Sequence, residues 1–175
     1  MKTPILETER LVLRPFKIED APTVFKNWTS DADVAKFMRW SVHNSVEDTV
    51  EWISSEIELL ISDNVYNWIF VLKSTDELIG SGGLVYNKDK EMFELGYNIM
   101  KKYCGIGITA DAAVEIVDFA KNSLSLPELF CCHAKENIAS GRVIEKLGFG
   151  YTGDSVYYSW DKSKKFDCRE YVLKF

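Results

Sequence analysis

The hydrophobic positions of the first half of the chain change their period along the sequence. Residues 9–15, ERLVLRP, hold a short run of apolar residues flanked by charged ones, which predicts a strand ended by Pro15. A short helix is predicted to begin near Glu19. From Ser45 onwards apolar residues recur every three or four positions, and Ser45 and Asp48 have the spacing of a capping-box variant. This part of the chain therefore predicts a strand followed by helices, the later helix packing on the core.

Three strand-like segments come next, separated by the short polar turns STD and KDK. They cover residues 64–73, 77–87 and 91–100. Because such short turns join strands that run in opposite directions, we expect an antiparallel meander. Glycines inside the middle segment indicate a bulge or the close approach of another backbone: Gly80, Gly82 and Gly83.

The second half begins with an amphipathic helix that reaches about Ser123, with an apolar stripe opposite an acidic one. Residues 128–134 form a short strand, which a right-handed crossover would lay parallel to segment 91–100. A second helix, NIASGRVIEKLGF, stops at Gly148, and two further strands close the chain as an antiparallel pair. The pattern predicts a single α/β domain over residues 1–175, with a mixed and largely antiparallel sheet.

Composition excludes several classes of function. The chain has 175 residues, of which 46% are hydrophobic, and no apolar run approaches the roughly 20 residues of a membrane helix. A net charge of −6 argues against nucleic acid as a partner. The N-terminal segment lacks the features of a secretion signal, so we expect a cytoplasmic location away from membranes. Four cysteines without CxxC spacing indicate neither a disulfide framework nor a metal site.

The stretch KKYCGIGITADA, residues 101–112, places two lysines and two glycines just before a helix. Helix N-termini offer unpaired N–H groups to anions, and glycine lets a bulky phosphate approach the backbone, so this loop could hold a pyrophosphate. A tight turn explains the same glycines equally well. GIGITA also fits the dinucleotide fingerprint GxGxxG/A, which would make the protein an NAD(P)-binding oxidoreductase. The following chain is too short for that class of fold, which leaves this third alternative the weakest.

The order of these segments decides between the alternatives. A meander ending in FELGYNIM, then KYCGIGIT at a helix start, a strand and NIASGRVIEKLGF resembles the GCN5-related N-acetyltransferase (GNAT) superfamily. Its acetyl-CoA loop has the pattern Q/RxxGxG/A, and here Lys102, Gly105 and Gly107 occupy the patterned positions. The segments ETERLVLRPFKIEDA and KFMRW resemble the branch that acetylates the N-termini of ribosomal proteins.

The resemblance implies a GNAT-like mixed sheet flanked by helices, with a splayed parallel strand pair at the cofactor site. It implies transfer of an acetyl group from acetyl-CoA, the cosubstrate, to a primary amine within a ternary complex, without a metal. The acceptor would be a small molecule or a peptide or protein N-terminus, and the protein a monomer or homodimer. An acyl-CoA-binding module without turnover is the alternative.

The resemblance also assigns residues. Glu94 would be the general base and Ser140 the acid for the leaving thiolate, while Trp40 would border the acceptor. Asn137 and Ser140 also have the spacing of a helix N-cap and its N3 position, which is a purely structural alternative. The expected cofactor-binding residues lie on the third meander strand, in the loop, and before the last helix: Asn98, Ile99, Met100, Lys102, Tyr103, Cys104, Gly105, Ile106, Gly107, Ile108, Thr109 and Asn137.

Four positions depart from the pattern of the resembled family. Lys102 replaces the usual Gln or Arg, which keeps the positive charge but loses the planar bidentate geometry. Cys104 stands where a Trp is common, and Ile106 where a basic residue is common. Ile144 occupies the position of a Tyr that in many members protonates the leaving thiolate. That Tyr role therefore cannot be assigned here.

Overall fold

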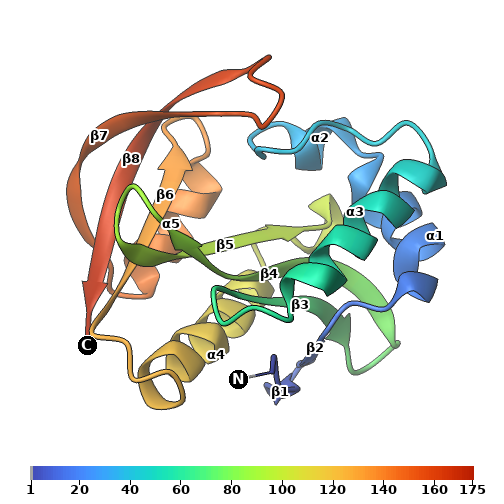
Figure 1. The fold of residues 1–175 in the computed structure, drawn as a ribbon, viewed down its shortest axis with the longest axis horizontal. Helices are drawn as coiled ribbons and strands as arrows, with labels where there is room; N and C mark the ends of the chain where they lie inside the picture. Colours follow the sequence, from blue (N-terminus) through green and yellow to red (C-terminus); the bar gives the residue numbers. More distant parts are fainter. Residues whose placement is uncertain (1) are drawn as a thin grey trace.

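A computed structural model describes residues 2–175, and its centre is one mixed sheet (Figure 1). Within the described residues the sheet has eight strands in the order β1-β2-β3-β4-β5-β6-β8-β7. Neighbouring strands are antiparallel except for the parallel pair β5 and β6. The strands are β1 Leu6–Glu7, β2 Leu11–Arg14, β3 Val65–Leu72, β4 Glu77–Asn87, β5 Met92–Ile99, β6 Glu128–Ala134, β7 Gly150–Tyr158 and β8 Lys165–Lys174.

Helices cover both faces of this sheet. The longest are α3 and α4, and a π-helical turn, Phe25–Thr29, extends α1. The α-helices are α1 Ala21–Val24, α2 Ala32–Ala35, α3 Val46–Leu59, α4 Ile108–Asn122 and α5 Ile138–Lys146, with 3₁₀ turns at Ile18–Asp20 and Lys101–Tyr103. No helix in residues 2–175 is both long and apolar enough to span a bilayer.

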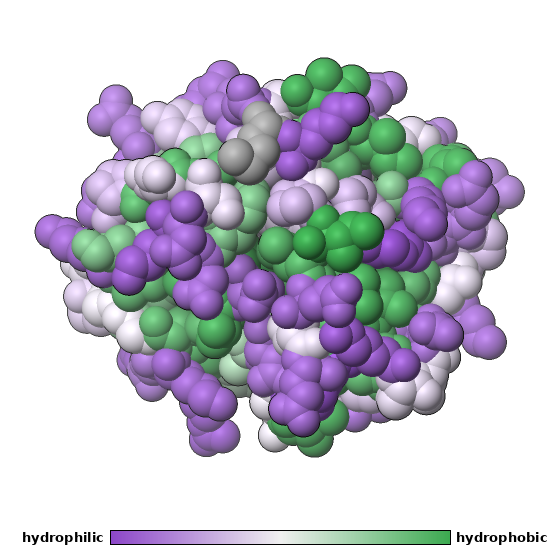
Figure 2. All heavy atoms as spheres, turned by 90° about the horizontal axis from the view of Figure 1, so that it is seen from below, coloured by the Kyte–Doolittle hydropathy of each residue, from purple (hydrophilic) through white to green (hydrophobic). Residues whose placement is uncertain are grey.

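The alternation of side chains along each strand divides the interior into two main apolar clusters. Trp68 and Phe70 of β3 point towards α4 and α5, where they meet Ile116 and Phe119. Ile69, between them in sequence, points the other way into a cluster with α1 and α3. On the side of the molecule seen in Figure 2, hydrophilic and hydrophobic side chains are interspersed.

The fold predicted from the sequence is confirmed. The meander, the crossover that makes β6 parallel to β5, and the closing antiparallel pair are all present. The capping box of α3 is formed: Ser45 Oγ accepts a hydrogen bond from the Asp48 N–H at 3.2 Å, and Asp48 Oδ2 accepts one from the Ser45 N–H at 3.2 Å. A sheet with one parallel pair is not the parallel sheet of a dinucleotide-binding domain, so the oxidoreductase alternative loses its structural basis.

The glycines of β4 explain both features expected of them. The register slips where Phe70 and Val71 of β3 pair with Gly80 and Leu78, so β4 carries a bulge beside Gly80. Gly83 lies opposite Asn67, and a Cβ atom on Gly83 would stand 2.1 Å from the carbonyl oxygen of Tyr66. Only glycine therefore fits where β3 and β4 approach at this position.

Gly83→Ala is expected to lower the free energy of unfolding by about 1–3 kcal/mol or more, because the clashing atoms belong to the backbone of a paired strand. Gly96→Ala is the matched control, since Gly96 lies directly opposite on β5 and a Cβ there meets nothing within 4 Å. Urea unfolding of the two variants and the wild type measures the difference. Equal stability of the two variants would contradict the proposed backbone clash.

Candidate active site

The two parallel strands at the centre of the sheet separate soon after they meet. Among residues 2–175, β5 and β6 pair in register at Glu94 and Phe130 alone. Asn98 and Ile99, further along β5, still pair with β4 on the other side. The backbone edge of β5 that faces β6 is therefore left open beyond Glu94, which is the splayed geometry expected from the sequence.

A cavity of about 470 Å³ lies on the α4 and α5 side of this opening. The N-terminus of α4 forms part of its wall. Gly107 is the N-cap residue of α4, with φ +81°, and it supplies no side chain to cap the first amides. Arg10 holds this turn from outside the cavity, with its Nε 2.7 Å from Asp111 Oδ2 and its Nη1 3.3 Å from the Ile106 carbonyl oxygen. Uncapped helix amides behind glycine suit an anionic group such as a pyrophosphate.

Lys102, expected beside that pyrophosphate, points elsewhere. Its Nζ lies 2.6 Å from Glu77 Oε1 on β4, and the Tyr103 hydroxyl donates to Glu77 Oε2 at 2.5 Å. The hydrogen bond between the Lys102 ammonium and Glu77 raises the pKa of Lys102. Neither Lys102 nor Tyr103 lines the cavity, because the 3₁₀ turn directs both side chains towards β4.

Other cations do line it. Arg142 and Lys146, both exposed on α5, stand at the cavity wall without an ion pair among the described residues. Lys101 also lines the cavity, but its ammonium pairs with Asp33 of α2. The positive charge available to phosphates therefore comes mainly from α5.

Two hydroxyl groups, from Ser140 of α5 and Tyr97 of β5, meet at the start of α5. Asn137 caps the helix, its Oδ1 accepting the Ser140 N–H at 3.2 Å, so the structural N-cap alternative is realised. Ser140 Oγ lies 3.1 Å from the Tyr97 hydroxyl. Burial raises the pKa of Tyr97, which keeps this hydroxyl protonated and able to donate. Sequence reasoning missed Tyr97, whose place in ELGYNIM gave it the opposite strand face to Glu94.

A second cavity, of about 500 Å³, adjoins the first on the α3 side. Its floor includes Gly83 and Gly96, and above Gly96 an added Cβ would meet nothing within 4 Å, which leaves room over the sheet there. The two cavities share residues at the opening of the sheet, namely Phe37, Met38, Tyr97, Asn98, Asn137 and Ser140. Asn98 donates from Nδ2 to Ser81 Oγ at 2.7 Å, while its buried Oδ1 has no partner among the described residues. An unused acceptor thus stands where the cavities meet.

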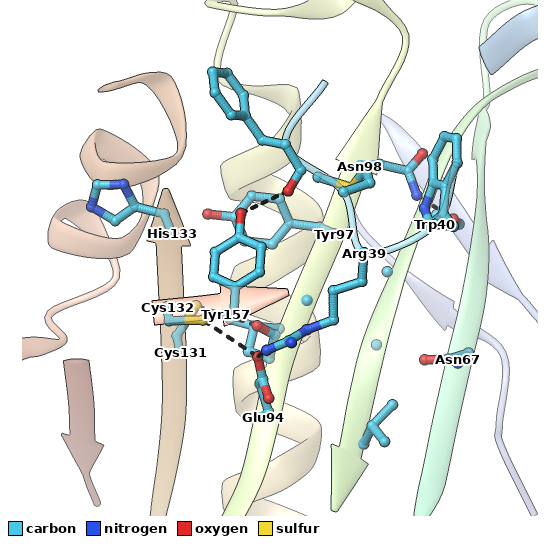
Figure 3. Close-up of a pocket in the computed structure, with 18 of the residues that line it drawn as sticks. Arg39, Trp40, Asn67, Glu94, Tyr97, Asn98, Cys131, Cys132, His133 and Tyr157 are labelled. Atoms are coloured by element: carbon cyan, nitrogen blue, oxygen red, sulfur yellow. Dashed lines mark hydrogen bonds and ion pairs between the residues drawn. The ribbon is translucent and has the colours of Figure 1, made fainter. Parts of the chain in front are cut away.

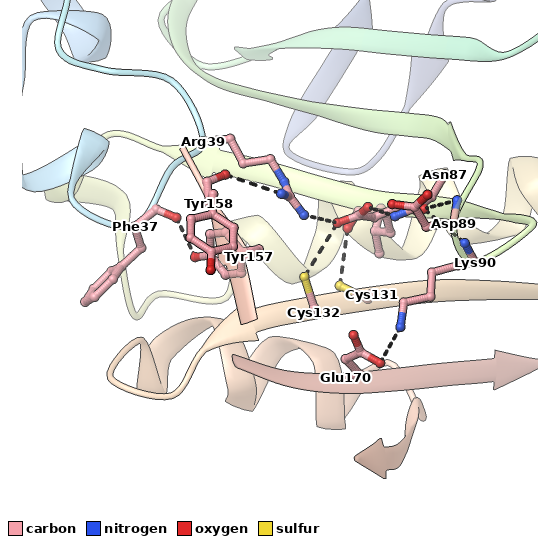
Figure 4. A network of polar contacts seen from close by, with 12 residues as sticks. Phe37, Arg39, Asn87, Asp89, Lys90, Cys131, Cys132, Tyr157, Tyr158 and Glu170 are labelled. Atoms are coloured by element: carbon pink, nitrogen blue, oxygen red, sulfur yellow. Dashed lines mark hydrogen bonds and ion pairs between the residues drawn. The ribbon is translucent and has the colours of Figure 1, made fainter. Parts of the chain in front are cut away.

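Glu94 lines this second cavity and is held by three neighbours (Figure 3). Its Oε2 accepts a hydrogen bond from Asn87 Nδ2 at 2.8 Å. Its Oε1 lies 3.6 Å from Arg39 Nη2 and 3.6 Å from Cys132 Sγ. Asn87 is fixed in turn by the backbone amides of Asp89 and Lys90, so the carboxylate sits in a defined network (Figure 4).

Arg39 belongs to a segment, residues 36–45, that crosses from α2 to α3 above the second cavity. The segment is tied to the β7–β8 hairpin by the Trp160 N–H, which donates to the Arg39 carbonyl at 2.7 Å. The Tyr157 hydroxyl donates to the Phe37 carbonyl at 2.7 Å, and the Arg39 guanidinium lies 4.8 Å from the Tyr157 ring centre. This crossing encloses the cavity, and no local sequence signal could have indicated a contact across 120 residues.

Trp40 also lines the second cavity, as expected for a residue beside the acceptor. Its ring centre lies 5.8 Å from that of His43, which stands 5.9 Å from Trp52. His43 Nδ1 is 2.8 Å from Thr49 Oγ1, and burial lowers the pKa of His43, which favours the neutral ring. His43 thus supports an aromatic wall.

The thiols near the site are poor nucleophiles. Burial raises the pKa of Cys132, and the charge of Glu94 raises it further. Burial also raises the pKa of Cys104, although Lys101 opposes that rise. Because the thiolate is the reactive form, protonated thiols argue against a covalent acyl-cysteine intermediate.

The predicted site residues fall into two groups. Those that line a cavity are Trp40, Glu94, Asn98, Ile99, Cys104, Gly105, Gly107, Thr109, Asn137 and Ser140. Those whose side chains lie elsewhere are Met100, Lys102, Tyr103, Ile106 and Ile108. Ile108 is 1% exposed in the core, whereas Ile106 is 55% exposed to solvent. A role through their backbone groups stays a prediction for this second group.

The sheet opens between its two parallel strands, and two adjoining cavities share residues at this opening. The model of the acetyltransferase (GNAT) domain family matches residues 10–150, so the chain belongs to the GNAT family of acetyltransferases, whose general acyl donor is acetyl-CoA.

Similar proteins agree with this family. An uncharacterized N-acetyltransferase, p20 of Bacillus licheniformis, is 28% identical and aligns over 96% of this chain and 94% of its own. The structure of a putative ribosomal-protein-serine acetyltransferase from Vibrio cholerae superposes with a TM-score of 0.86 at 18% identity, covering 100% of both chains. The microcin C7 self-immunity acetyltransferase MccE, solved in complex with acetyl-CoA and AMP, gives 0.82 at 14% identity over 96% and 94%. At these identities the two structures are evidence for the fold alone.

Proposed function

We propose that this protein transfers the acetyl group of acetyl-CoA directly to a primary amine held with it in a ternary complex. The observation that carries the proposal is the pair of adjoining cavities that share residues at the opening between β5 and β6. The cavity beside α4 would hold the cofactor, with its pyrophosphate on the amides behind Gly107. The cavity beside α3 would hold the acceptor.

In this scheme Glu94 takes a proton from the acceptor ammonium, directly or through water, and the free amine attacks the thioester carbonyl carbon. The carbon–sulfur bond then breaks, and the thiolate of CoA takes a proton from Ser140. The hydroxyl of Ser140 is restored by the second proton that the acceptor nitrogen loses as it becomes an amide. Tyr97 stands behind Ser140 and can return a hydrogen bond to its oxygen. A thiolate needs only a modest acid, since a thiol has a pKa of roughly 8.5. The protonated state of Cys104 and Cys132 supports direct transfer over a cysteine intermediate.

Binding and turnover are tested separately. Calorimetric titration is expected to give binding of acetyl-CoA and CoA but none of NADH. Release of CoA thiol is expected when a panel of amines is added with acetyl-CoA, the panel holding diamines, amino acids, aminoglycosides and peptides with free N-termini. Binding of CoA without thiol release from any amine would favour the non-catalytic acyl-CoA-binding alternative, and binding of NADH alone would refute the proposal.

A further inference from the structure

The far end of the acceptor cavity carries a buried carboxylate. Glu56 projects from α3 and is only 9% exposed, yet it lines the cavity. Its Oε2 accepts a hydrogen bond from Asn67 Nδ2 at 2.5 Å. Within residues 2–175 no Lys, Arg or His stands within ion-pair distance of Glu56, and its hydrogen-bond donor, the Asn67 amide, carries no charge. Burying an unpaired carboxylate is costly, and proteins seldom retain one without a partner.

The electrostatic state of Glu56 agrees with this geometry. Burial raises its pKa, and the neutral side chains of Asn67 and Trp52 oppose the rise. A cation brought into the cavity would stabilise the ionised carboxylate in surroundings of low dielectric constant. Arg39, the cation that lines the same cavity, is already engaged with Glu94.

The position of Glu56 relative to the reacting end follows from the register of the sheet. Its partner Asn67 on β3 lies opposite Gly83 on β4, which lies opposite Gly96 on β5. Two strand spacings separate Asn67 from Gly96, or about 10 Å across the sheet. Glu94 flanks Gly96 on the same strand face, and the space above Gly96, where an added Cβ would meet nothing within 4 Å, leaves an open trough in the cavity that both carboxylates line.

The wall along this trough is aromatic. Trp40, Trp52 and Phe16 line the cavity, with the Phe16 and Trp52 rings 5.4 Å apart and nearly perpendicular. Such a wall suits a chain of methylene groups and can also attract a cation to a ring face. The cavity volume of about 500 Å³ is that of a small-molecule site.

We infer that Glu56 binds a second positive charge on the acceptor, so that the preferred acceptor is an acyclic diamine or polyamine with an ammonium group about 10 Å from the attacking nitrogen. The inference rests on the proposed amine acetylation. A monoamine has its one ammonium group at the reacting end and leaves Glu56 without a partner, and an amino acid with a neutral side chain brings no second cation to it.

The test compares α,ω-diamines of increasing length with monoamines of the same length, using kcat/KM for thiol release. In the wild type we expect a diamine long enough to reach Glu56 to exceed its matched monoamine by about tenfold to a hundredfold, the range of a charge-assisted hydrogen bond. Glu56→Gln should lower kcat/KM for the diamine and leave that for the monoamine unchanged, so that most of the difference between them is lost. Glu58→Gln, which neutralises an exposed carboxylate of the same helix, should leave the ratio as in the wild type.

A second measurement separates this inference from the proposed function. Calorimetric titration of a diamine into the CoA complex does not depend on turnover, and its affinity should fall at least about tenfold in Glu56→Gln. The variant should fold as well as the wild type, because it removes a buried unpaired charge. If no amine is turned over, the proposed function fails, while diamine binding that depends on Glu56 still supports the site. Equal affinity in both proteins, or equal kcat/KM for diamines and monoamines, would overturn the inference.

Discussion

Replacing Gly107 with glutamate is expected to lower the affinity for acetyl-CoA by more than about a hundredfold while the protein remains folded. The added carboxylate would stand at the uncapped N-terminus of α4, where we propose that the pyrophosphate binds, and like charges placed together cost several kcal/mol. Arg10 Nη2 lies 3.7 Å from the position of the new Cβ, but its guanidinium already serves Asp111 and the Ile106 carbonyl. It can offset only part of the repulsion.

Two controls separate charge from bulk and from backbone strain. Gly107→Gln has the same size without the charge, so it should bind acetyl-CoA more tightly than the Glu variant. Gly107→Asn tests the backbone, because φ at this position is +81° and asparagine tolerates the left-handed conformation better than other side chains. Calorimetry gives the affinities, and thermal unfolding without ligand gives the stabilities. An affinity for the Glu variant equal to the wild type would rule out a phosphate site at this turn.

The sequence predicts most of this fold because its elements have a strong period or clear end signals. The meander, α4 and β6 are found close to their expected bounds, and β4 and β6 match them in full. What was missed is short: β1 has two residues and α2 has four, too few to show a period. β1 is held by its pairing with the neighbouring strand β2, and α2 by an ion pair between Asp33 and the distant Lys101.

The candidate site is predictable only where one element carries it. The alternation along β5 is enough to bring Glu94 and Asn98 to one face. Arg39 could not be inferred, because its approach to Glu94 depends on a segment held by the β7–β8 hairpin. The direction of the Lys102 side chain could not be inferred either, since it depends on Glu77 of β4.

Glu56 is a different case, because a signal for it was present. It lies on the same helical stripe as Ile53, three residues before it, and Leu60, four residues after it. An acidic residue on the apolar stripe of a helix is unusual and points to a buried partner or a ligand. The pattern could therefore have marked Glu56 as a candidate, although not the cavity that it faces.

Glu94→Gln is expected to lower kcat by about a hundredfold to ten-thousandfold, with acetyl-CoA affinity unchanged, if Glu94 is the general base. Glutamine keeps the size of the side chain and can still accept the hydrogen bond from Asn87, but it cannot take a proton from the acceptor. Steady-state kinetics with the best amine of the panel, together with calorimetry for acetyl-CoA, measure the two quantities. The deficit should shrink as the pH approaches the acceptor's own pKa of about 10, because solvent then supplies the free amine.

Loss of charge alone must be separated from loss of a base. Asp89→Asn removes an exposed carboxylate that lines the same cavity. Because Asp89 is not the proposed general base, this change should lower kcat by less than about tenfold. A merely structural role for Glu94, as the partner of Arg39, makes a different prediction: Arg39→Gln and Glu94→Gln would then lose stability equally, and kcat would change little in both. A large loss of kcat confined to Glu94→Gln, restored in part at high pH, distinguishes the base from the ion-pair partner, since only proton transfer depends on the ionisation of the acceptor.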